Sequence, residues 1–191
     1  MRTASLAFGL SLALLTLPVL AQPVPPPAAS PAPPKPAAPA KAPALPAATG
    51  PEVWFAAKAT GGAMAYNASS IKPDPTLGTV SVTSAVYLNA PLKSPSGAQF
   101  QYVVADDRLD CVGGKFQSRA RIMMDTTTKI VDATDAGEKA EWQPVAGNPI
   151  MTILTRVACQ GRPIAGAKQT ANFPETAKML KTLAAQPAKQ N

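Results

Sequence analysis

Residues 79–88 have the sequence Thr-Val-Ser-Val-Thr-Ser-Ala-Val-Tyr-Leu, in which apolar and polar side chains alternate. One face of this stretch carries Val80, Val82, Val86 and Leu88, and the other carries Thr79, Ser81, Thr83 and Tyr87. A period of two with many β-branched residues predicts a half-buried β-strand. The fold can be assigned outward from this strand.

The same alternation recurs after this strand, and short apolar runs precede it. The Asp-Thr-Thr-Thr stretch at 125–128 is expected to turn the chain into a hairpin. Short sequential strands with tight links predict an antiparallel meander. We expect about six strands, over 53–55, 62–67, 79–88, 98–105, 115–124 and 129–131.

Two later segments change to a helical period. In 148–160, apolar residues recur at helical spacing, with Asn148 as the expected N-cap and Gly161 as the expected C-terminal stop. A weaker stripe over 172–186 follows a capping-box spacing that begins at Asn172. The predicted fold is therefore α+β: an antiparallel meander with one or two C-terminal helices covering one sheet face.

The composition argues against most enzyme classes. The 191 residues contain no His, which excludes Ser-His-Asp and Cys-His catalysis and zinc sites built on imidazole. Phosphate-binding and dinucleotide motifs are also missing from the sequence. Asp106, Asp107 and Asp110 are expected to lie in a solvated loop. We predict a protein that is not an enzyme and that needs no cofactor or metal ion.

The N-terminus has the pattern of an export signal. Arg2 supplies a positive charge, an apolar run extends from Leu6 to Leu20, and small or tolerated side chains precede a cleavage point after Ala21. The run is shorter than the roughly 20 residues of a membrane-spanning helix. No Cys lies near the cleavage point, so we expect an exported protein that is not a lipoprotein. Its location would be the periplasm, the cell surface or the medium.

The chain after the signal divides by composition. Residues 22–51 contain 12 prolines in 30 positions, which prevents helix and sheet from propagating. We expect a disordered Pro/Ala-rich linker there, able to act as a semi-rigid spacer. The predicted organisation is a signal peptide at 1–21, this linker at 22–51, one domain at 52–186 and a tail at 187–191.

The chain has two cysteines, Cys111 and Cys159. Exported proteins meet an oxidising compartment, so an even pair is most simply bonded. Such a bond would tie the sheet to the predicted first helix. A redox-active or metal-binding pair is the alternative, although neither a C-x-x-C spacing nor a helper His supports it.

A series of landmarks resembles a known family. In order they are Trp54, Tyr66-Asn67, Ser70-Ile71, Asp110-Cys111, Trp142 to Val145, and Cys159. Their order over residues 52–161 is similar to the surface-adhesin protein E-like domain of Gram-negative bacteria. The resemblance implies a small α+β binding domain with Cys111 bonded to Cys159 and with Trp54 and Trp142 in the core. The namesake is a lipid-anchored adhesin of host matrix proteins, whereas this chain lacks the lipobox cysteine.

Basic residues mark the best candidate binding surface. Lys115, Arg119 and Arg121 are expected to project from one face of the strand at 115–124, opposite its apolar side chains. Such a stripe could bind an anionic glycan or an acidic protein, and an ordinary solvated sheet face is the alternative. Export argues against nucleic acid as a partner. The sequence thus predicts a non-enzymatic cell-envelope binding protein or, alternatively, a periplasmic accessory subunit tethered by its Pro/Ala segment.

Overall fold

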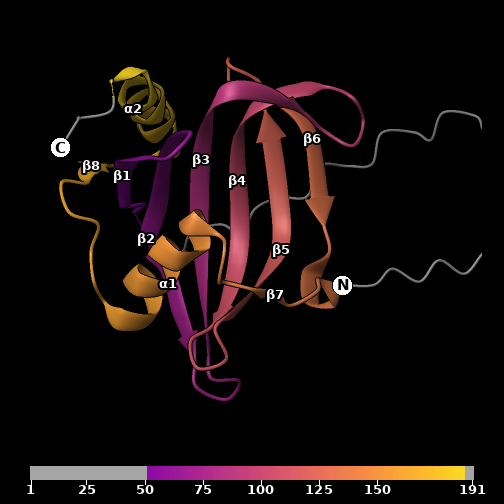
Figure 1. Cartoon of the computed structure of the whole chain (residues 1–191), viewed down its shortest axis with the longest axis vertical. Helices are drawn as coiled ribbons and strands as arrows, with labels where there is room; N and C mark the ends of the chain where they lie inside the picture. Colours follow the sequence, from indigo (N-terminus) through magenta and orange to yellow (C-terminus); the bar gives the residue numbers. More distant parts are fainter. Residues whose placement is uncertain (1–50, 188–191) are drawn as a thin grey trace, which may run out of the picture. The chain divides into compact units, whose positions relative to one another are not determined.

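The computed structural model describes residues 51–187, which form one antiparallel sheet and two helices (Figure 1). The strand order is β6-β5-β4-β3-β2-β1-β8, and β7 pairs with β5. The strands are β1 Trp54–Ala59, β2 Gly62–Asp74, β3 Thr79–Lys93, β4 Gln99–Asp110, β5 Lys115–Met124, β6 Ile130–Asp135, β7 Gln143–Pro144 and β8 Lys168–Thr170. The helices are η1 Gly137–Lys139 (a 3-10 turn), α1 Pro149–Gln160 and α2 Phe173–Ala185.

The predicted antiparallel meander is confirmed from β1 to β6. The short strands β7 and β8 were not predicted, because two or three residues are too few to show a periodic pattern. The expected boundary of β4 was wrong. This strand continues to Asp110, so Asp106 and Asp107 lie within a strand rather than in a loop. The predicted signal peptide and nearly all of the Pro/Ala segment lie outside the described residues.

Both helices begin after the predicted N-cap residues, and α1 ends at the predicted glycine. The side chain of Asn148 accepts a hydrogen bond from the Met151 amide at 3.1 Å, and Gly161 ends α1 with φ of 63°. The side chain of Asn172 caps α2 through the Glu175 amide at 3.0 Å. No helix in residues 51–187 is long and apolar enough to cross a membrane.

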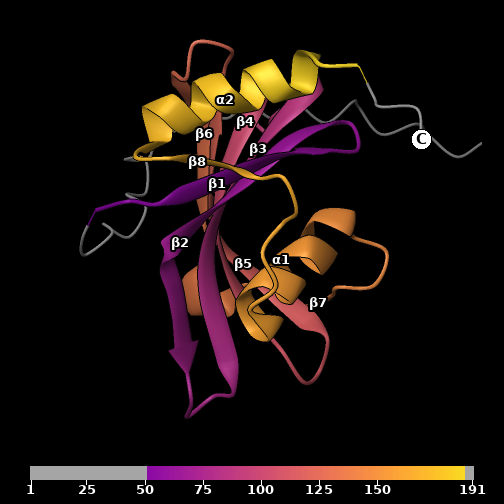
Figure 2. The ribbon, with the colours of Figure 1, turned by 90° about the vertical axis from the view of Figure 1, so that its left-hand side faces the viewer.

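Each face of the sheet is covered by a different helix, whereas helix was expected on one face only. Successive residues of β2 show why: Ala63 and Ala65 pack beneath α2, while Met64 and Tyr66 pack beneath α1. Figure 2 shows α2 lying across one end of the sheet and α1 packed lower down. The central strands therefore bury apolar side chains on both faces. The apolar surface buried on each face stabilises the fold.

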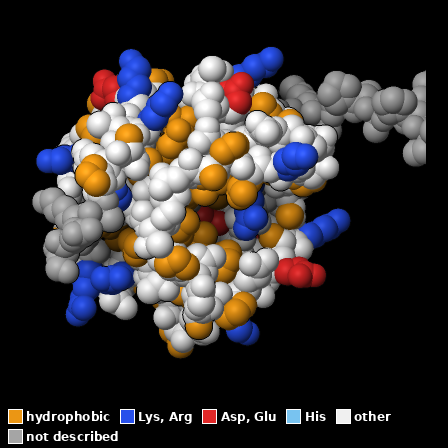
Figure 3. Space-filling model, turned by 45° about the horizontal axis from the view of Figure 1, so that its top comes forward, with side chains coloured by type: hydrophobic (Ala, Val, Ile, Leu, Met, Phe, Trp, Pro, Cys, Tyr) orange, Lys and Arg blue, Asp and Glu red, His pale blue; other side chains and the backbone are white. Residues whose placement is uncertain are grey.

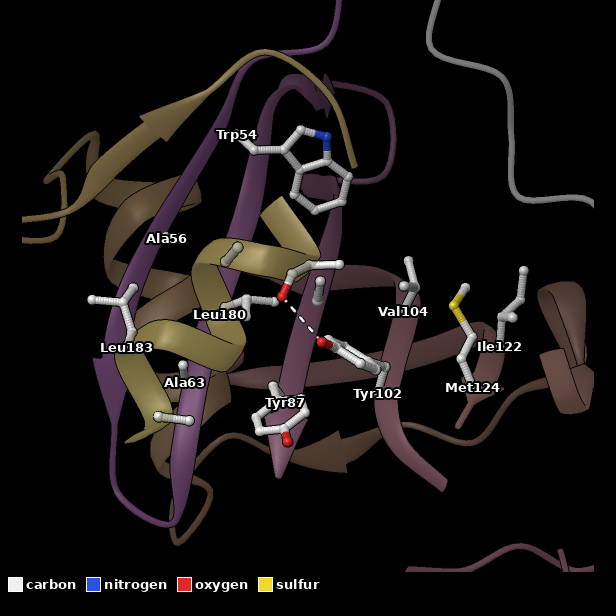
Figure 4. Packing of buried hydrophobic residues seen from close by; sticks show 14 residues of the cluster. Trp54, Ala56, Ala63, Tyr87, Tyr102, Val104, Ile122, Met124, Leu180 and Leu183 are labelled. Carbon is white, nitrogen blue, oxygen red and sulfur yellow. Dashed lines mark hydrogen bonds between the residues drawn. The ribbon is translucent and has the colours of Figure 1, made fainter. Parts of the chain in front are cut away.

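The cluster under α2 contains the only aromatic hydroxyl that bonds to a helix in the described residues. Tyr102 donates from Oη to the Ala177 carbonyl at 3.1 Å and lies against Tyr87, with ring centroids 4.7 Å apart (Figure 4). Burial, followed by the nearby Tyr87, raises the pKa of Tyr102 to about 12. The phenol therefore stays protonated and able to donate at neutral pH.

The two tryptophans have different environments. Trp54 is 2% exposed, as expected, and its indole nitrogen donates to the Glu52 carboxylate at 2.9 Å. The expected core position of Trp142 was wrong, since this side chain is 41% exposed. It lies in the connection between η1 and β7, beyond both hydrophobic clusters.

The predicted bond between Cys111 and Cys159 is confirmed. Their Cα atoms are 5.6 Å apart and their sulfurs are bonded. Cys111 directly follows β4, and Cys159 lies in the last turn of α1. The bond therefore fixes one end of the sheet to the helix that covers it.

Candidate functional site

A β-bulge at Arg119 changes the arrangement expected for the basic residues of β5. Asp106 pairs with Ala120 while Asp107 pairs with Ser118, so Arg119 has no partner position on β4. A bulge resets the alternation of side chains along its strand. Positions before and after Arg119 therefore do not follow the single pattern that the sequence suggested.

The three predicted binding residues do not form one exposed face. Arg119 donates to the Asp106 carboxylate at 2.6 Å, whereas Arg121 donates to Ser118 Oγ, which in turn donates to Asp107 at 2.6 Å. Asp106 and Asp107 are successive strand residues and point to opposite faces. Arg119 and Arg121 therefore lie on opposite faces of the sheet. Lys115 lies at the exposed start of β5.

The side chain of Arg119 is only 20% exposed and also approaches Glu138 at 3.4 Å. The Asp106 carboxylate that it contacts is 9% exposed. A base that projects from a solvated face, as expected for all three, could be replaced without disturbing the core. For Arg119 this does not hold, because its loss would leave a buried carboxylate without its cation.

Asp107 is the more deeply buried of the two carboxylates, with 0% exposure. Its oxygens accept from Ser84 at 3.1 Å and Ser118 at 2.6 Å. Desolvation raises the pKa of Asp107 above its usual value, and the two serines oppose this rise. Desolvation also raises the pKa of Asp106, with Arg119 as the main opposing influence.

Arg108 completes this group of charges. It forms a bidentate ion pair with Glu138, whose pKa is lowered first by that hydrogen bond. We use "charge network" for Asp106, Arg108, Arg119 and Glu138. Its two acids and two bases are matched across β4, β5 and η1. Such an arrangement holds strands in register and leaves little free charge for a ligand.

A second group of charged residues surrounds a groove beside β1 and β8. Three adjoining depressions, of about 600, 770 and 240 Å³, share lining residues. Lys58 lines the two larger depressions, and Ile153 lines the depressions of about 600 and 240 Å³. We use "edge groove" for this surface, lined chiefly by Lys58, Ile153, Arg156, Arg162, Ile164, Lys168, Leu183 and Ala184.

The edge groove forms where the two hydrophobic clusters reach the surface. Leu183 and Ala184 belong to the cluster under α2, whereas Ile153 and Ile164 pack against the cluster under α1. The connection from α1 to β8 runs between the helices (Figure 2). The floor is therefore apolar and comes from elements distant in the sequence.

The rim of the edge groove is basic. Lys58, Arg156, Arg162 and Lys168 are all exposed, and no acidic residue lines the three depressions. None of the four makes an ion pair within the described part of the chain. Figure 3 shows one face of the molecule, on which Lys and Arg side chains lie mainly towards the outline and hydrophobic side chains are scattered between them. The edge groove, with bases beside apolar side chains, is suited to an anionic partner with apolar parts.

The sequence analysis did not predict the edge groove, because its bases lie on three separate segments. One feature of the sequence does point to it, namely an excess of bases near the C-terminus. Residues 149–187 carry five bases, at Arg156, Arg162, Lys168, Lys178 and Lys181, against Glu175 as the single acid. The excess of bases over acids among residues 51–187 is thus concentrated near the C-terminal elements. On β5, Arg119 is ion-paired, whereas Lys115 and Arg121 are exposed.

No group of three potential metal ligands occurs within residues 51–187. Comparison with known proteins adds no assignment: no protein-family model and no curated protein matches the chain.

Proposed function

We propose that the chain is an exported, non-enzymatic protein of the cell envelope whose domain at 52–186 binds an anionic protein or glycan. The observation that carries this proposal is the disulfide between Cys111 and Cys159. Structural disulfides persist in oxidising compartments and are rare where thiols are kept reduced. The signal-like sequence at 1–21 points to the same compartment.

The edge groove supports the binding role. Bases without acidic partners attract anions, and the attraction is strongest where neighbouring surface is apolar. The resemblance to adhesin E-like domains suggests an envelope or host macromolecule as the partner. The alternative is an accessory subunit of an envelope assembly, held by its Pro/Ala segment.

Cell fractionation tests the export step. We expect the protein in the periplasm, in the outer membrane fraction or in the medium, with Gln22 or its cyclised form at the N-terminus by mass spectrometry. Peptide mapping without reductant should recover one cross-linked peptide pair containing Cys111 and Cys159. Cytoplasmic protein that retains Met1 and two alkylatable thiols would contradict the proposal.

Binding to purified matrix proteins and anionic glycans tests the binding step. The comparison variant carries Lys58→Gln, Arg156→Gln, Arg162→Gln and Lys168→Gln. A matched control removes the same charge elsewhere, through Lys72→Gln, Lys93→Gln, Lys178→Gln and Lys181→Gln. Loss of binding only in the first variant supports the proposal, and equal binding by all three proteins contradicts it. Selective co-purification with one bacterial assembly would favour the accessory-subunit alternative.

A further inference from the structure

We propose that the edge groove binds a phosphorylated lipid, with an alkyl chain along its apolar floor and the phosphate among its bases. This inference rests on the anion-binding role proposed for the edge groove and assigns to that surface a ligand of a different class. A single amphiphile accounts for both properties of the groove. An anionic glycan or acidic peptide would use the rim and leave the floor without a function.

The floor fits an alkyl chain because apolar residues face it from both sides. Ile153 and Ile164 are half-buried on the α1 side, while Leu183 and Ala184 are each 8% exposed on the α2 side. The two larger depressions, of about 600 and 770 Å³, lie in the size range of ligand sites. A chain seated there would cover surface from both hydrophobic clusters without opening either of them.

The rim fits phosphate better than a single carboxylate. Phosphate monoesters carry about −1.5 to −2 charges near neutral pH and offer three acceptor oxygens. The rim offers two guanidinium groups, from Arg156 and Arg162, which match phosphate oxygens in bidentate geometry. Lys58 and Lys168 line the depression of about 770 Å³ and add point charges beside the floor.

Lys58 is the most informative residue to change. It lines both larger depressions, on the exposed last part of β1, and makes no ion pair within residues 51–187. Its replacement should weaken binding and leave the fold intact. Arg156, exposed on α1, provides a second contact from the opposite side of the groove.

The experiment titrates the purified full chain with decyl phosphate below its micelle concentration, using calorimetry and amide chemical shifts. Decanol tests the chain alone, inorganic phosphate tests the head group alone, and decanoate tests a singly charged head group. We expect decyl phosphate to bind at least about tenfold more tightly than each of the three. Octyl, decyl and dodecyl phosphate should differ by about two- to fourfold per added methylene.

The variants assign this binding to the groove. Lys58→Gln combined with Arg156→Gln should weaken decyl phosphate binding at least about tenfold. The control, Lys178→Gln with Lys181→Gln on α2, removes the same charge from exposed residues outside the lining and should bind as wild type. Ile153→Ser should reduce the dependence on chain length. Equal melting temperatures check that all of these proteins fold.

Three results would overturn the inference. Inorganic phosphate binding as tightly as decyl phosphate would show an anion site without lipid selectivity. Equal weakening in both charge variants would show an effect of net charge alone. Competition by an acidic peptide, with no dependence on chain length, would show that the partner is a polypeptide.

These measurements separate the inference from the proposed function. If decyl phosphate fails to bind while an exported protein still binds a matrix protein or glycan, only the lipid assignment fails. If decyl phosphate binds a protein that fractionation places in the cytoplasm, the export proposal fails and the lipid site remains.

Discussion

The charge network and the edge groove differ in how their charges are satisfied. In the network, Arg119 and Arg108 are matched by Asp106 and Glu138 within hydrogen-bonding distance. In the groove, four bases line an apolar floor without an acid among the lining residues. A charge that is buried and paired holds the structure together, whereas an exposed unpaired charge is available to a partner. Basic residues in a sequence therefore need a structure before they can be assigned to either role.

The disulfide connects the two regions. Cys111 follows β4, which carries Asp106 and Arg108 of the charge network, and Cys159 lies on α1, which forms one side of the edge groove. Replacing both with Ser should lower the free energy of unfolding by about 4 kcal/mol, from the entropy of the open loop. Urea unfolding of oxidised wild type and of the double variant measures this loss. An unchanged midpoint would show that the packing of α1 fixes the connection without the bond.

Arg119→Met should produce the next largest effect. It leaves the carboxylate of Asp106 buried without its cation, which costs about 2 kcal/mol after allowance for the partial exposure of Arg119. Asp106→Asn in the same chain should recover part of the loss. If the single variant is as stable as wild type by urea unfolding, the network does not stabilise the sheet.

Asp107→Asn should increase stability at neutral pH by about 1 kcal/mol, because an amide avoids the cost of burying a charge. The amide oxygen can accept from one of the two serines, Ser84 and Ser118, while the amide NH2 donates to the other. Burial raises the folded-state pKa of Asp107 above 3.8. Between 3.8 and the raised pKa, the folded protein binds more protons than the unfolded chain, so this residue makes stability fall as pH rises.

The Asp107→Asn variant should therefore lose that part of the pH dependence. The free energy of unfolding is measured for wild type and variant from about pH 3 to pH 8. Asp106 and Glu138 titrate in both proteins, so their contributions cancel in the difference. Parallel stability curves would mean that Asp107 has the same proton affinity in the folded and unfolded states.

The smallest effect on stability is expected in the edge groove. Replacing Lys58, Arg156, Arg162 and Lys168 together with Gln should change the free energy of unfolding by less than about 0.5 kcal/mol, since all four are exposed and unpaired within residues 51–187. Thermal unfolding of this variant beside Arg119→Met tests the contrast between the regions. A loss as large as that of Arg119→Met would place the groove bases among the structural charges.

Local patterns in the sequence determined much of the fold. Alternation in residues 79–88 was enough to identify β3, and capping at Asn148, Gly161 and Asn172 marked both ends of α1 and the start of α2. Two cysteines in a chain with an export-like N-terminus were enough to predict their bond. These features rest on neighbours in the chain or on simple pairing, so they are visible without a structure.

The tertiary structure decided which charges are paired and where free charge gathers. The bulge at Arg119 depends on the register between β4 and β5, which no alternation in one strand reveals. The edge groove brings together β1, α1, β8 and α2, which are far apart in the sequence. Periodicity records how a segment meets its nearest neighbours, whereas a surface of this kind depends on how distant segments pack.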